Sequence, residues 1–334
     1  MQGIELDRVT AWASDRIPEL VPPLSFSLIA GGHSNLTYRF LDARGESYVL
    51  RRPPLGHVLE SAHDMGREHR IVAALADTDV PVPPEHGHCD DVEVNGAPFY
   101  LMGYVDGLVL HNAAAVGDMP RGERRSLGEH VVEVLAALHA IDPDAVGLGD
   151  LGRREAYLAR QLRRWSKQWA ATQTHDVPEM EESERLLREN MPEQVGASIA
   201  HGDYRLGNMI IGDGRIRAVL DWELCTLGDP LADLGYLLNN WMQPDEPEAP
   251  AAATGAGGFG SRESVCLAYE EATERDLSRI DYYRAFSHWR LAAIAQGVYK
   301  RYLVGAMGES RGVDLEQQKQ GVTARARTAL AFLR

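Results

Sequence analysis

The sequence contains little cysteine and no long apolar run. Its 334 residues include three cysteines, Cys89, Cys225 and Cys266, which are far apart and lack the spacing of a metal site. This pattern indicates free thiols in a reducing compartment rather than a disulfide framework. No apolar stretch approaches the ~20 residues that span a bilayer, and residues 1–20 have neither segment of a signal peptide. These absences predict a soluble, cytoplasmic protein without a membrane partner.

Positive charge is also scarce. The sequence has 34 Lys and Arg against 49 Asp and Glu, a formal net charge of −15. This balance argues against nucleic acid as the main partner, because phosphate contacts need a basic face. It remains compatible with a local basic pocket for a small anion. The length and the 44% hydrophobic content are enough for two domains or lobes.

The pattern of apolar residues changes after Gly107, from short strands to helices. The elements expected before it are an N-terminal helix, a strand at 24–30, a hairpin turning at Ala43–Gly45, a helix within 61–84 and a hairpin turning at Asn95-Gly96. The pattern predicts an α+β fold with two lobes. A small antiparallel β-rich N-lobe occupies residues 1–104, and a larger, mostly helical C-lobe occupies residues 105–334. Ligands favour the crevice between two such units.

The stretch IAHGDYRLGNMIIGDGRIRAVLDWE, residues 199–223, interrupts the helices with a predicted hairpin. A two-residue turn at Asp213-Gly214 pairs Asn208 with Val219 and makes Asn208 and Asp221 diagonal neighbours, roughly 7–8 Å apart. Their oxygens suit one hard cation such as Mg²⁺. Asp203 lies in the preceding loop, where it could accept a proton from a substrate hydroxyl. The alternative is an Asx-rich turn in which these side chains only cap the backbone.

Two motifs in this stretch resemble the protein-kinase-like fold. Asp203-x-x-x-x-Asn208 is similar to its catalytic loop, and Asp221 to its metal-binding aspartate. HGDYRLGN and LDWE resemble the aminoglycoside phosphotransferases and choline-kinase-like enzymes. GGHSN, YVLRRPP and LDWELCTLGDPLADLGYLL are most similar to the subgroup that includes the kinase-like domain fused to some acyl-CoA dehydrogenases. The resemblance covers roughly residues 25–300 and implies an ATP- and Mg²⁺-dependent phosphotransferase.

The resemblance assigns the first partners of the nucleotide to the N-lobe. Arg51, in YVLRRPP, stands where kinases carry a lysine, and an arginine keeps the charge and adds a bidentate fork. Glu68 falls on the apolar face of its helix, where a carboxylate should be paired. Arg51 is the obvious partner. The alternative places Glu68 at the edge of the apolar face, in contact with water.

Two further segments of the N-lobe are expected to contact the nucleotide. AGGHSN replaces the glycine-rich loop, so Ser34 and Asn35 could offer donors to phosphate; an ordinary hairpin turn is the alternative. FYLMGYVDG resembles the hinge between the lobes. By that resemblance Met102 lies at the back of the adenine pocket, and backbone groups of Gly103 and Val105 bind the adenine edge.

Other polar residues of the C-lobe are expected to support the catalytic loop. The resemblance implies that Asp233 anchors the loop through backbone hydrogen bonds, and His201 is expected to brace it. The role of Glu223 stays open between a second metal, the substrate and an arginine. A metal hydrolase site built from His201, Asp203 and Asp221 is a third possibility, but it lacks a second histidine at ligand spacing.

The acceptor is expected to be a small molecule with a hydroxyl group. Residues 243–260 predict a lid or a disordered loop that shapes its pocket with the following helices. An aminoglycoside is one candidate, and a hydroxyacyl thioester is another. The phosphates of the thioester would require basic residues such as Arg153, Arg154, Arg160, Arg163, Arg164 and Lys167, although this run is also typical of a solvated helix face. A nucleotide-binding pseudokinase that acts as a binding module is the alternative to an enzyme.

Overall fold

The N-terminal part of the chain forms one antiparallel sheet. The computed structural model describes residues 1–29, 35–55, 64–305 and 314–334. Its five-stranded sheet has the order β1-β2-β3-β5-β4, with the strands β1 (Ser25–Leu28), β2 (Leu36–Leu41), β3 (Ser47–Arg52), β4 (Glu85–Cys89) and β5 (Phe99–Gly103). The helices of this part are α1 (Leu6–Ser14), α2 (Met65–Leu75) and α3 (Val92–Asn95). The N-terminal helix, the first hairpin and the α2 helix are present as predicted.

Alternation along β5 divides the packing between the two faces of the sheet. Phe99 and Leu101 belong to the apolar cluster that contains the buried face of α1. Tyr100 and Met102 belong to a second cluster, together with Met65 at the start of α2. The sheet is therefore covered by α1 on one face and by α2 on the other. This arrangement aims the alternate residues of β3 and β5 at α2.

The hairpin predicted at Asn95-Gly96 is wrong. Residues Val92–Asn95 form the short helix α3, and Gly96 ends it with a positive φ of 69°. The Asp91 side chain accepts from the Glu93 N–H at 2.9 Å, so an N-cap starts a helical turn where strand pairing was expected. Gly96 then serves as a left-handed helix cap instead of a hairpin turn. β4 and β5 still pair, but they lie outside the predicted turn.

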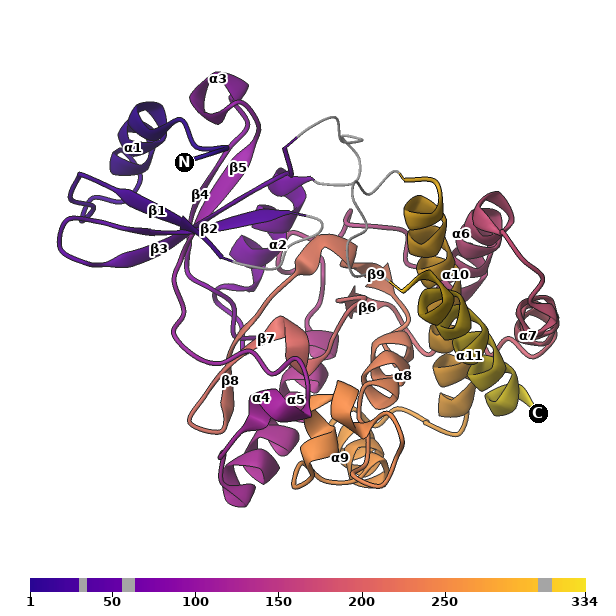
Figure 1. Cartoon of the computed structure of the whole chain (residues 1–334). Coiled ribbons are helices and arrows are strands. Elements are labelled where there is room, and N and C mark those ends of the chain that lie inside the picture. Colours follow the sequence, from indigo (N-terminus) through magenta and orange to yellow (C-terminus); the bar gives the residue numbers. More distant parts are fainter. Residues whose placement is uncertain (30–34, 56–63, 306–313) are drawn as a thin grey trace.

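The remainder of the described chain is mostly helical, with two small strand pairs. Its helices are α4 (Ala113–Val116), α5 (Arg121–Ala140), α6 (Tyr157–Thr172), α7 (Pro178–Glu189), α8 (Leu231–Asn239), α9 (Arg262–Thr273), α10 (Ile280–Leu303) and α11 (Leu315–Leu333). β6 (Ser198–Ala200) pairs with β9 (Thr226–Gly228), and β7 (Met209–Gly212) pairs with β8 (Arg215–Val219). Figure 1 shows the sheet on one side of the molecule and the helices on the other. The predicted α+β class is confirmed.

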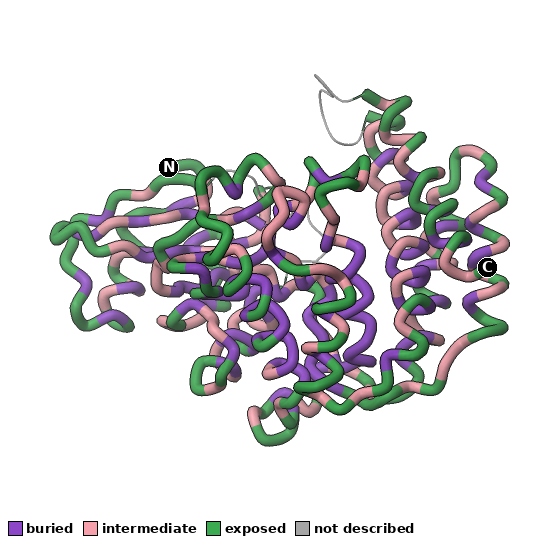
Figure 2. The backbone as a smooth tube through the Cα atoms, turned by 90° about the horizontal axis from the view of Figure 1, so that it is seen from below, coloured by how far each residue is buried: buried purple, intermediate pink, exposed green. Residues whose placement is uncertain are grey.

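Helix α8 forms the centre of the helical part. All of its residues are buried, and most of them are apolar, as expected for a helix inside the core; Asp233 is the buried charged exception. Figure 2 shows this buried interior, with the exposed residues distributed around the outside. Helix α10 packs against both α8 and α11. In the described residues no helix is long and apolar enough to cross a membrane.

Residues 243–260 are part of the packed structure, so the predicted disorder is wrong. They contain the 3₁₀ turns η4 (Ala249–Ala251) and η5 (Ala253–Ala256). Ala249, Ala253 and Phe259 are buried. The reason is the close approach of this segment to α5. A Cβ added at Gly128 of α5 would lie only 2.1 Å from the Phe259 carbonyl oxygen.

Candidate active site

The predicted turn at Asp213-Gly214 forms, but the strands it joins are not in simple register. Both turn residues have positive φ, 52° and 66°, as a type I′ turn requires. The pairing next to the turn is the predicted one, but the register shifts between Ile210 and Ile211. This β-bulge adds one residue to β8. Every pairing beyond the bulge is therefore displaced by one position.

The bulge corrects the pairing predicted for Asn208. Met209 lies opposite Val219, and the Leu220 N–H donates to the Asn208 carbonyl oxygen at 2.8 Å. Asn208 is thus opposite Leu220, directly before Asp221. Asp221 has a positive φ of 65°, a conformation that a non-glycine residue adopts only when its surroundings require it. Both predicted metal ligands lie at the open end of the hairpin.

The Asp203 carboxylate is held by donors from both sides of the loop. Asn208 Nδ2 donates to Asp203 Oδ2 at 2.8 Å, and Arg205 Nε donates to Oδ1 at 3.2 Å. The hydroxyl of Tyr236, on α8, also donates to Oδ1. The side chain of Asp203 remains 21% exposed. These contacts fix a carboxylate that a substrate can still reach, and they leave the amide oxygen of Asn208 facing away from it.

Buried hydrogen bonds anchor the predicted catalytic loop to the helices beneath it. Asp233 accepts from the backbone N–H of His201 at 2.6 Å and of Gly202 at 2.8 Å, as the resemblance implied. Burial alone would raise the pKa of Asp233, but its hydrogen bonds, first that with His139, hold that pKa below its usual value. The other nitrogen of His139 lies 2.7 Å from the Tyr269 hydroxyl. The loop is therefore anchored to α5, α8 and α9.

His201 braces the same loop with both ring nitrogens. Nε2 lies 2.9 Å from the Leu220 carbonyl oxygen, and Nδ1 accepts from the Asp203 N–H at 3.2 Å. The residue is fully buried. An imidazole engaged in this way has no nitrogen left for a metal. The bracing role predicted for His201 is confirmed, and the hydrolase site that needed it as a ligand is not supported.

Arg51 joins the N-lobe to Asp221, the predicted metal ligand. Its Nε lies 2.8 Å from Glu68 Oε2, and its Nη2 lies 2.7 Å from Asp221 Oδ1. The Glu68 side chain is only 3% exposed. It also accepts from the Tyr100 hydroxyl at 3.2 Å and from the Asn35 amide at 2.8 Å. The predicted pair of Arg51 and Glu68 is confirmed, and the alternative in which Glu68 meets water is wrong.

The electrostatics of this chain keep Arg51 charged. Burial by itself would lower the pKa of Arg51, but Tyr100, Glu68 and Asp221 raise it above its ordinary value. Burial raises the pKa of Glu68, and Arg51 opposes that shift. The partly buried guanidinium of Arg51 therefore lies between the carboxylates of Glu68 and Asp221.

The other residues predicted to contact the nucleotide differ in their burial and in their hydrogen bonds. Met102 is buried at the end of β5, and the Gly103 N–H donates to the Pro84 carbonyl oxygen at 2.7 Å, so only the Gly103 carbonyl could meet an adenine edge. Val105 is half-buried just after the strand. The Asn35 side chain is buried, and its amide donates to Glu68 Oε1 at 2.8 Å. Ser34 lies outside the described residues. These nucleotide contacts stay predictions.

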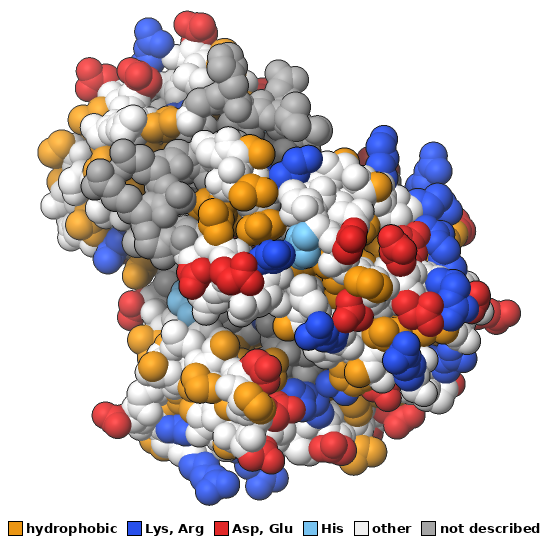
Figure 3. All heavy atoms as spheres, turned by 45° about the vertical axis from the view of Figure 1, so that its right-hand side comes forward, with side chains coloured by type: hydrophobic (Ala, Val, Ile, Leu, Met, Phe, Trp, Pro, Cys, Tyr) orange, Lys and Arg blue, Asp and Glu red, His pale blue; other side chains and the backbone are white. Residues whose placement is uncertain are grey.

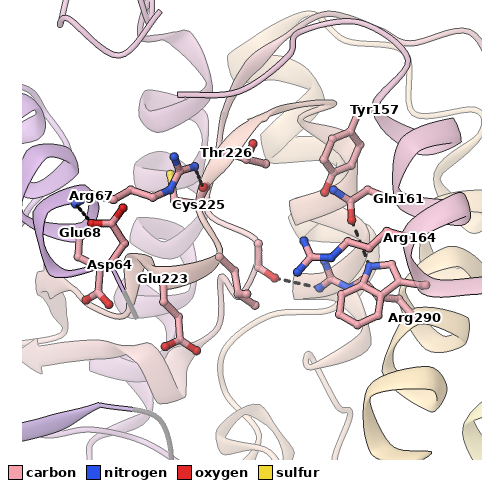
Figure 4. Close-up of a pocket in the computed structure, with 13 residues that line it drawn as sticks. Asp64, Arg67, Glu68, Tyr157, Gln161, Arg164, Glu223, Cys225, Thr226 and Arg290 are labelled. Carbon is pink, nitrogen blue, oxygen red and sulfur yellow. Dashed lines mark hydrogen bonds between the residues drawn. The ribbon is translucent and has the colours of Figure 1, made fainter. Parts of the chain in front are cut away.

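A cavity of about 240 Å³ opens beside this chain of contacts. It is lined by α2, α6, α10 and the segment after Asp221, including η3 (Trp222–Leu224), and Gly202 brings the catalytic loop into its wall. Figure 4 shows Glu68 and Glu223 on one side of it and Arg164 and Arg290 on the other. On the face drawn in Figure 3, acidic and basic side chains are interspersed over the helical part.

Sequence reasoning missed two residues of this site. Tyr236 follows Asp233 by three positions in α8, and that helical spacing could have placed its side chain beside the catalytic loop. Arg290 lies far along the chain on α10 and carries no motif. Of the predicted basic run, Arg164 lines the cavity, whereas Arg154 pairs with Asp144 at 2.7 Å. The run is therefore not one binding surface.

The chain has a protein-kinase-like fold. Its features are the five-stranded sheet, the anchored loop with Asp203 and the β7–β8 hairpin that precedes Asp221. The chain belongs to the phosphotransferase enzyme family, whose family model matches residues 25–267. It is 33% identical, with a TM-score of 0.84, to a solved structure from Ralstonia eutropha that is provisionally assigned as an aminoglycoside phosphotransferase. The match covers 98% of this chain and 97% of the other. The resemblance inferred from the motifs is confirmed.

Two further comparisons concern a longer relative and a more distant solved structure. The chain is 35% identical over 296 residues to acyl-CoA dehydrogenase family member 10 of Mus musculus, which covers 85% of this chain but 27% of that protein. The chain thus spans about a quarter of the length of this relative. A ternary complex of the aminoglycoside phosphotransferase APH(4)-Ia with AMP-PNP and hygromycin B has a TM-score of 0.61 at 17% identity, covering 96% of this chain and 98% of the other. That similarity concerns the fold alone.

Proposed function

We propose that this protein is an ATP- and Mg²⁺-dependent phosphotransferase that moves the γ-phosphoryl group to the hydroxyl of a small molecule. The observation that carries the proposal is the placement of Asp203 beside Asn208, with Arg51 bound to both Asp221 and Glu68 across the same site. Family membership and a solved relative in complex with an ATP analogue support the same reading. Residues 1–104 would bind the nucleotide, and residues 105–334 would carry the catalytic loop and the acceptor.

The reaction requires little covalent chemistry from the protein. The acceptor oxygen bonds to the γ-phosphorus, the bond from that phosphorus to the β–γ bridging oxygen breaks, and ADP leaves. Asp203 orients the acceptor hydroxyl and takes its proton. Arg51 binds phosphate oxygens as a charged fork, and Glu68 fixes its direction. The carbonyl of Gly103 and the N–H of Val105 would hold the adenine edge, in front of Met102.

The residues present fit a magnesium ion of the kinase type. Asn208 and Asp221 offer an amide and a carboxylate oxygen, which are hard ligands. Across the described parts of the chain, no cluster of three or more His, Cys, Asp or Glu could hold a metal without help. Mg²⁺ is usually bound by one or two protein ligands together with phosphates and water, and Asn208 and Asp221 would be those two ligands. When bound, the ion would neutralise charge on the phosphates.

The pseudokinase alternative is less well supported. It rested on the arginine in place of lysine and on the weak phosphate loop. Arg51 nevertheless makes the ion pair with Glu68 that the kinase lysine makes, and Asp203, Asn208 and Asp221 are all retained at one site. A binding module that does not transfer phosphate has no need of a fixed acid beside the metal ligands.

Thermal stability measured with ATP, with Mg²⁺ and with both tests the proposal. A ligand at 100 times its Kd adds about 2.7 kcal/mol to the free energy of unfolding. We expect the largest stabilisation with both ligands, and we expect Asp221→Asn to lose the increment due to Mg²⁺ because the amide cannot replace the carboxylate charge. If ATP stabilises the protein neither with nor without Mg²⁺, the proposal is wrong.

A further inference from the structure

The 240 Å³ cavity has acidic side chains on one side and arginines on the other. Its acids come from α2 and η3, on the side of the Arg51–Glu68 pair, and two arginines face them from α6 and α10 (Figure 4). A third arginine, Arg67, is already used, because its Nη2 donates to the carbonyl oxygens of Leu151 and Cys225 at 3.0 and 2.7 Å. The cations available to a ligand are therefore those of the α6–α10 side.

Arg290 is the deeper of these two arginines. It is 8% exposed, and its Nη2 donates to the Gly202 carbonyl oxygen at 2.9 Å. Its guanidinium carbon lies 5.4 Å from the ring of Tyr236, which holds Asp203. Within the described ranges its buried Nε has no hydrogen-bond partner. A buried cation without a counter-charge is costly, and among the described residues no carboxylate forms an ion pair with Arg290, so the site favours an anion that completes it.

Arg164 and Gln161 extend the same wall along α6. The guanidinium of Arg164 lies 5.0 Å from the centre of the Trp165 ring. Figure 4 shows this side chain extending towards the side of the cavity where Arg290 contacts the catalytic loop. Gln161 accepts from Trp165 Nε1 at 3.1 Å through its amide oxygen, so its amide nitrogen remains as a donor. This wall offers two positive charges and a neutral donor.

We infer that the acceptor carries an anionic group, a carboxylate or a phosphate, which binds between Arg164 and Arg290 with Gln161 as an additional donor. The inference rests on the proposed function and names the chemical class of its acceptor. Paired arginines recognise oxyanions through charge-assisted hydrogen bonds, and they would repel a polycationic acceptor. The bond from Arg290 to Gly202 places the anion site beside the catalytic loop.

Titration calorimetry on the full chain tests this with three compounds that differ only at one end: 6-hydroxyhexanoate, 1,6-hexanediol and 6-amino-1-hexanol. We expect the carboxylate to bind at least about tenfold more tightly than the diol, and the amine to bind least. Glycerol 3-phosphate compared with glycerol forms the phosphate arm and decides which anion is preferred. The amine binding as tightly as the carboxylate, or no preference for either anion, would overturn the inference.

Variants on α6 and α10 locate the site. Arg164→Gln and Arg290→Gln should each lower the affinity for the preferred anion at least about tenfold. Arg163→Gln, an exposed neighbour on the same helix that does not line the cavity, should leave it unchanged. If Arg290→Gln does not fold, Arg164→Gln carries the test. An equal loss in Arg163→Gln and Arg164→Gln contradicts the inference, because the anion would then respond only to the charge of the helix.

The two proposals fail separately. If ATP and Mg²⁺ stabilise the protein but neither anion binds better than its neutral match, the inference is wrong and the phosphotransferase proposal stands. If the anion binds in the predicted order but ATP has no effect, the anion site stands and the proposed function is wrong.

Discussion

Asp203 receives three donors from two parts of the chain. Asn208 and Arg205 belong to its own loop, whereas Tyr236 comes from α8. A carboxylate fixed at both oxygens has little rotational freedom. The loss of one donor should therefore change the orientation of the carboxylate without unfolding the protein. Substitutions at this site therefore separate the chemistry from the binding of the nucleotide.

We expect Asp203→Asn to reduce phosphoryl transfer by about 10²–10⁴-fold, because an amide cannot take the proton of the acceptor. Stabilisation by ATP with Mg²⁺ should be retained, since Asp203 is not a predicted ligand of either. Coupled ADP production and thermal unfolding provide the two measurements. Asp213→Asn is the matched control, because Asp213 is 88% exposed at the hairpin turn and asparagine tolerates its positive φ. Full activity in Asp203→Asn would refute the catalytic assignment.

Tyr236→Phe should lower kcat about tenfold while the KM for ATP changes little. The substitution keeps the ring and removes a hydrogen bond to a carboxylate, which is worth about 1.5–3 kcal/mol. Tyr236 acts through Asp203, so the pH dependence of kcat should also shift. Tyr282→Phe is the control, since it removes a buried hydroxyl that donates to the Leu187 carbonyl oxygen and not to Asp203. A parallel fall in both variants would mean a general loss of stability.

The helix α5 depends on close contact with the segment 243–260. Gly128 lies where the backbone of Phe259 crosses the helix, and no side chain fits between them. A glycine inside a helix normally costs stability relative to alanine. Its presence in α5 is explained by this contact, which a composition-based reading of a Pro/Ala/Gly-rich segment could not detect.

Gly128→Ala should therefore destabilise the protein by about 1–3 kcal/mol through overpacking. Gly122→Ala, on the same helix, should be neutral or stabilising by about 0.5–1 kcal/mol, because no atom lies within 4 Å of the added Cβ. Denaturant unfolding of both variants distinguishes overpacking from helix propensity. Stabilisation by both substitutions would show that the close contact does not form.

The contact between α10 and α11 contains a titratable group that affects the stability of the whole molecule. The ring of His288, on α10, stacks on Phe332, on α11, with 5.8 Å between ring centres. Burial, followed by Arg284, Arg325 and Arg262, lowers the pKa of His288 to about 4. The folded protein thus resists a proton that the unfolded chain accepts near the ordinary histidine pKa.

Stability should therefore fall as the pH decreases from about 6.5 to about 4, because only the unfolded state takes up the proton in that range. The full shift corresponds to about 3 kcal/mol, and partial solvent contact should reduce it. His288→Asn should flatten this part of the pH profile while other groups still contribute. Chemical unfolding at several pH values provides the measurement, and an unchanged slope in the variant would exclude His288 as a source.

Local patterns predicted much of the site. The apolar spacing of α2 identified Glu68 as a carboxylate in need of a partner, and Arg51 is that partner. The turn at Asp213-Gly214 predicted that Asn208 and Asp221 approach each other, but a bulge displaced the register by one residue. The Asn95-Gly96 pair was misread because the capping side chain of Asp91, four residues before Asn95, favoured a helix. In both cases two local structures compete: a β-bulge with simple strand register, and a capped helix with a hairpin turn. Alternation and turn type do not decide between them.

The sequence by itself determined the α+β class of fold, the hairpin that turns at Asp213-Gly214 and the position of Asn208 and Asp221 at its open end. These features depend on spacing within short segments, where the regular geometry of the backbone fixes the direction of each side chain from its position in the sequence. Only the tertiary structure decided that Tyr236 holds Asp203, and that Arg290 and Arg164 face one cavity. Those contacts join helices that are far apart in the chain. They form only because α6, α8 and α10 pack together, and local sequence patterns do not predict that packing.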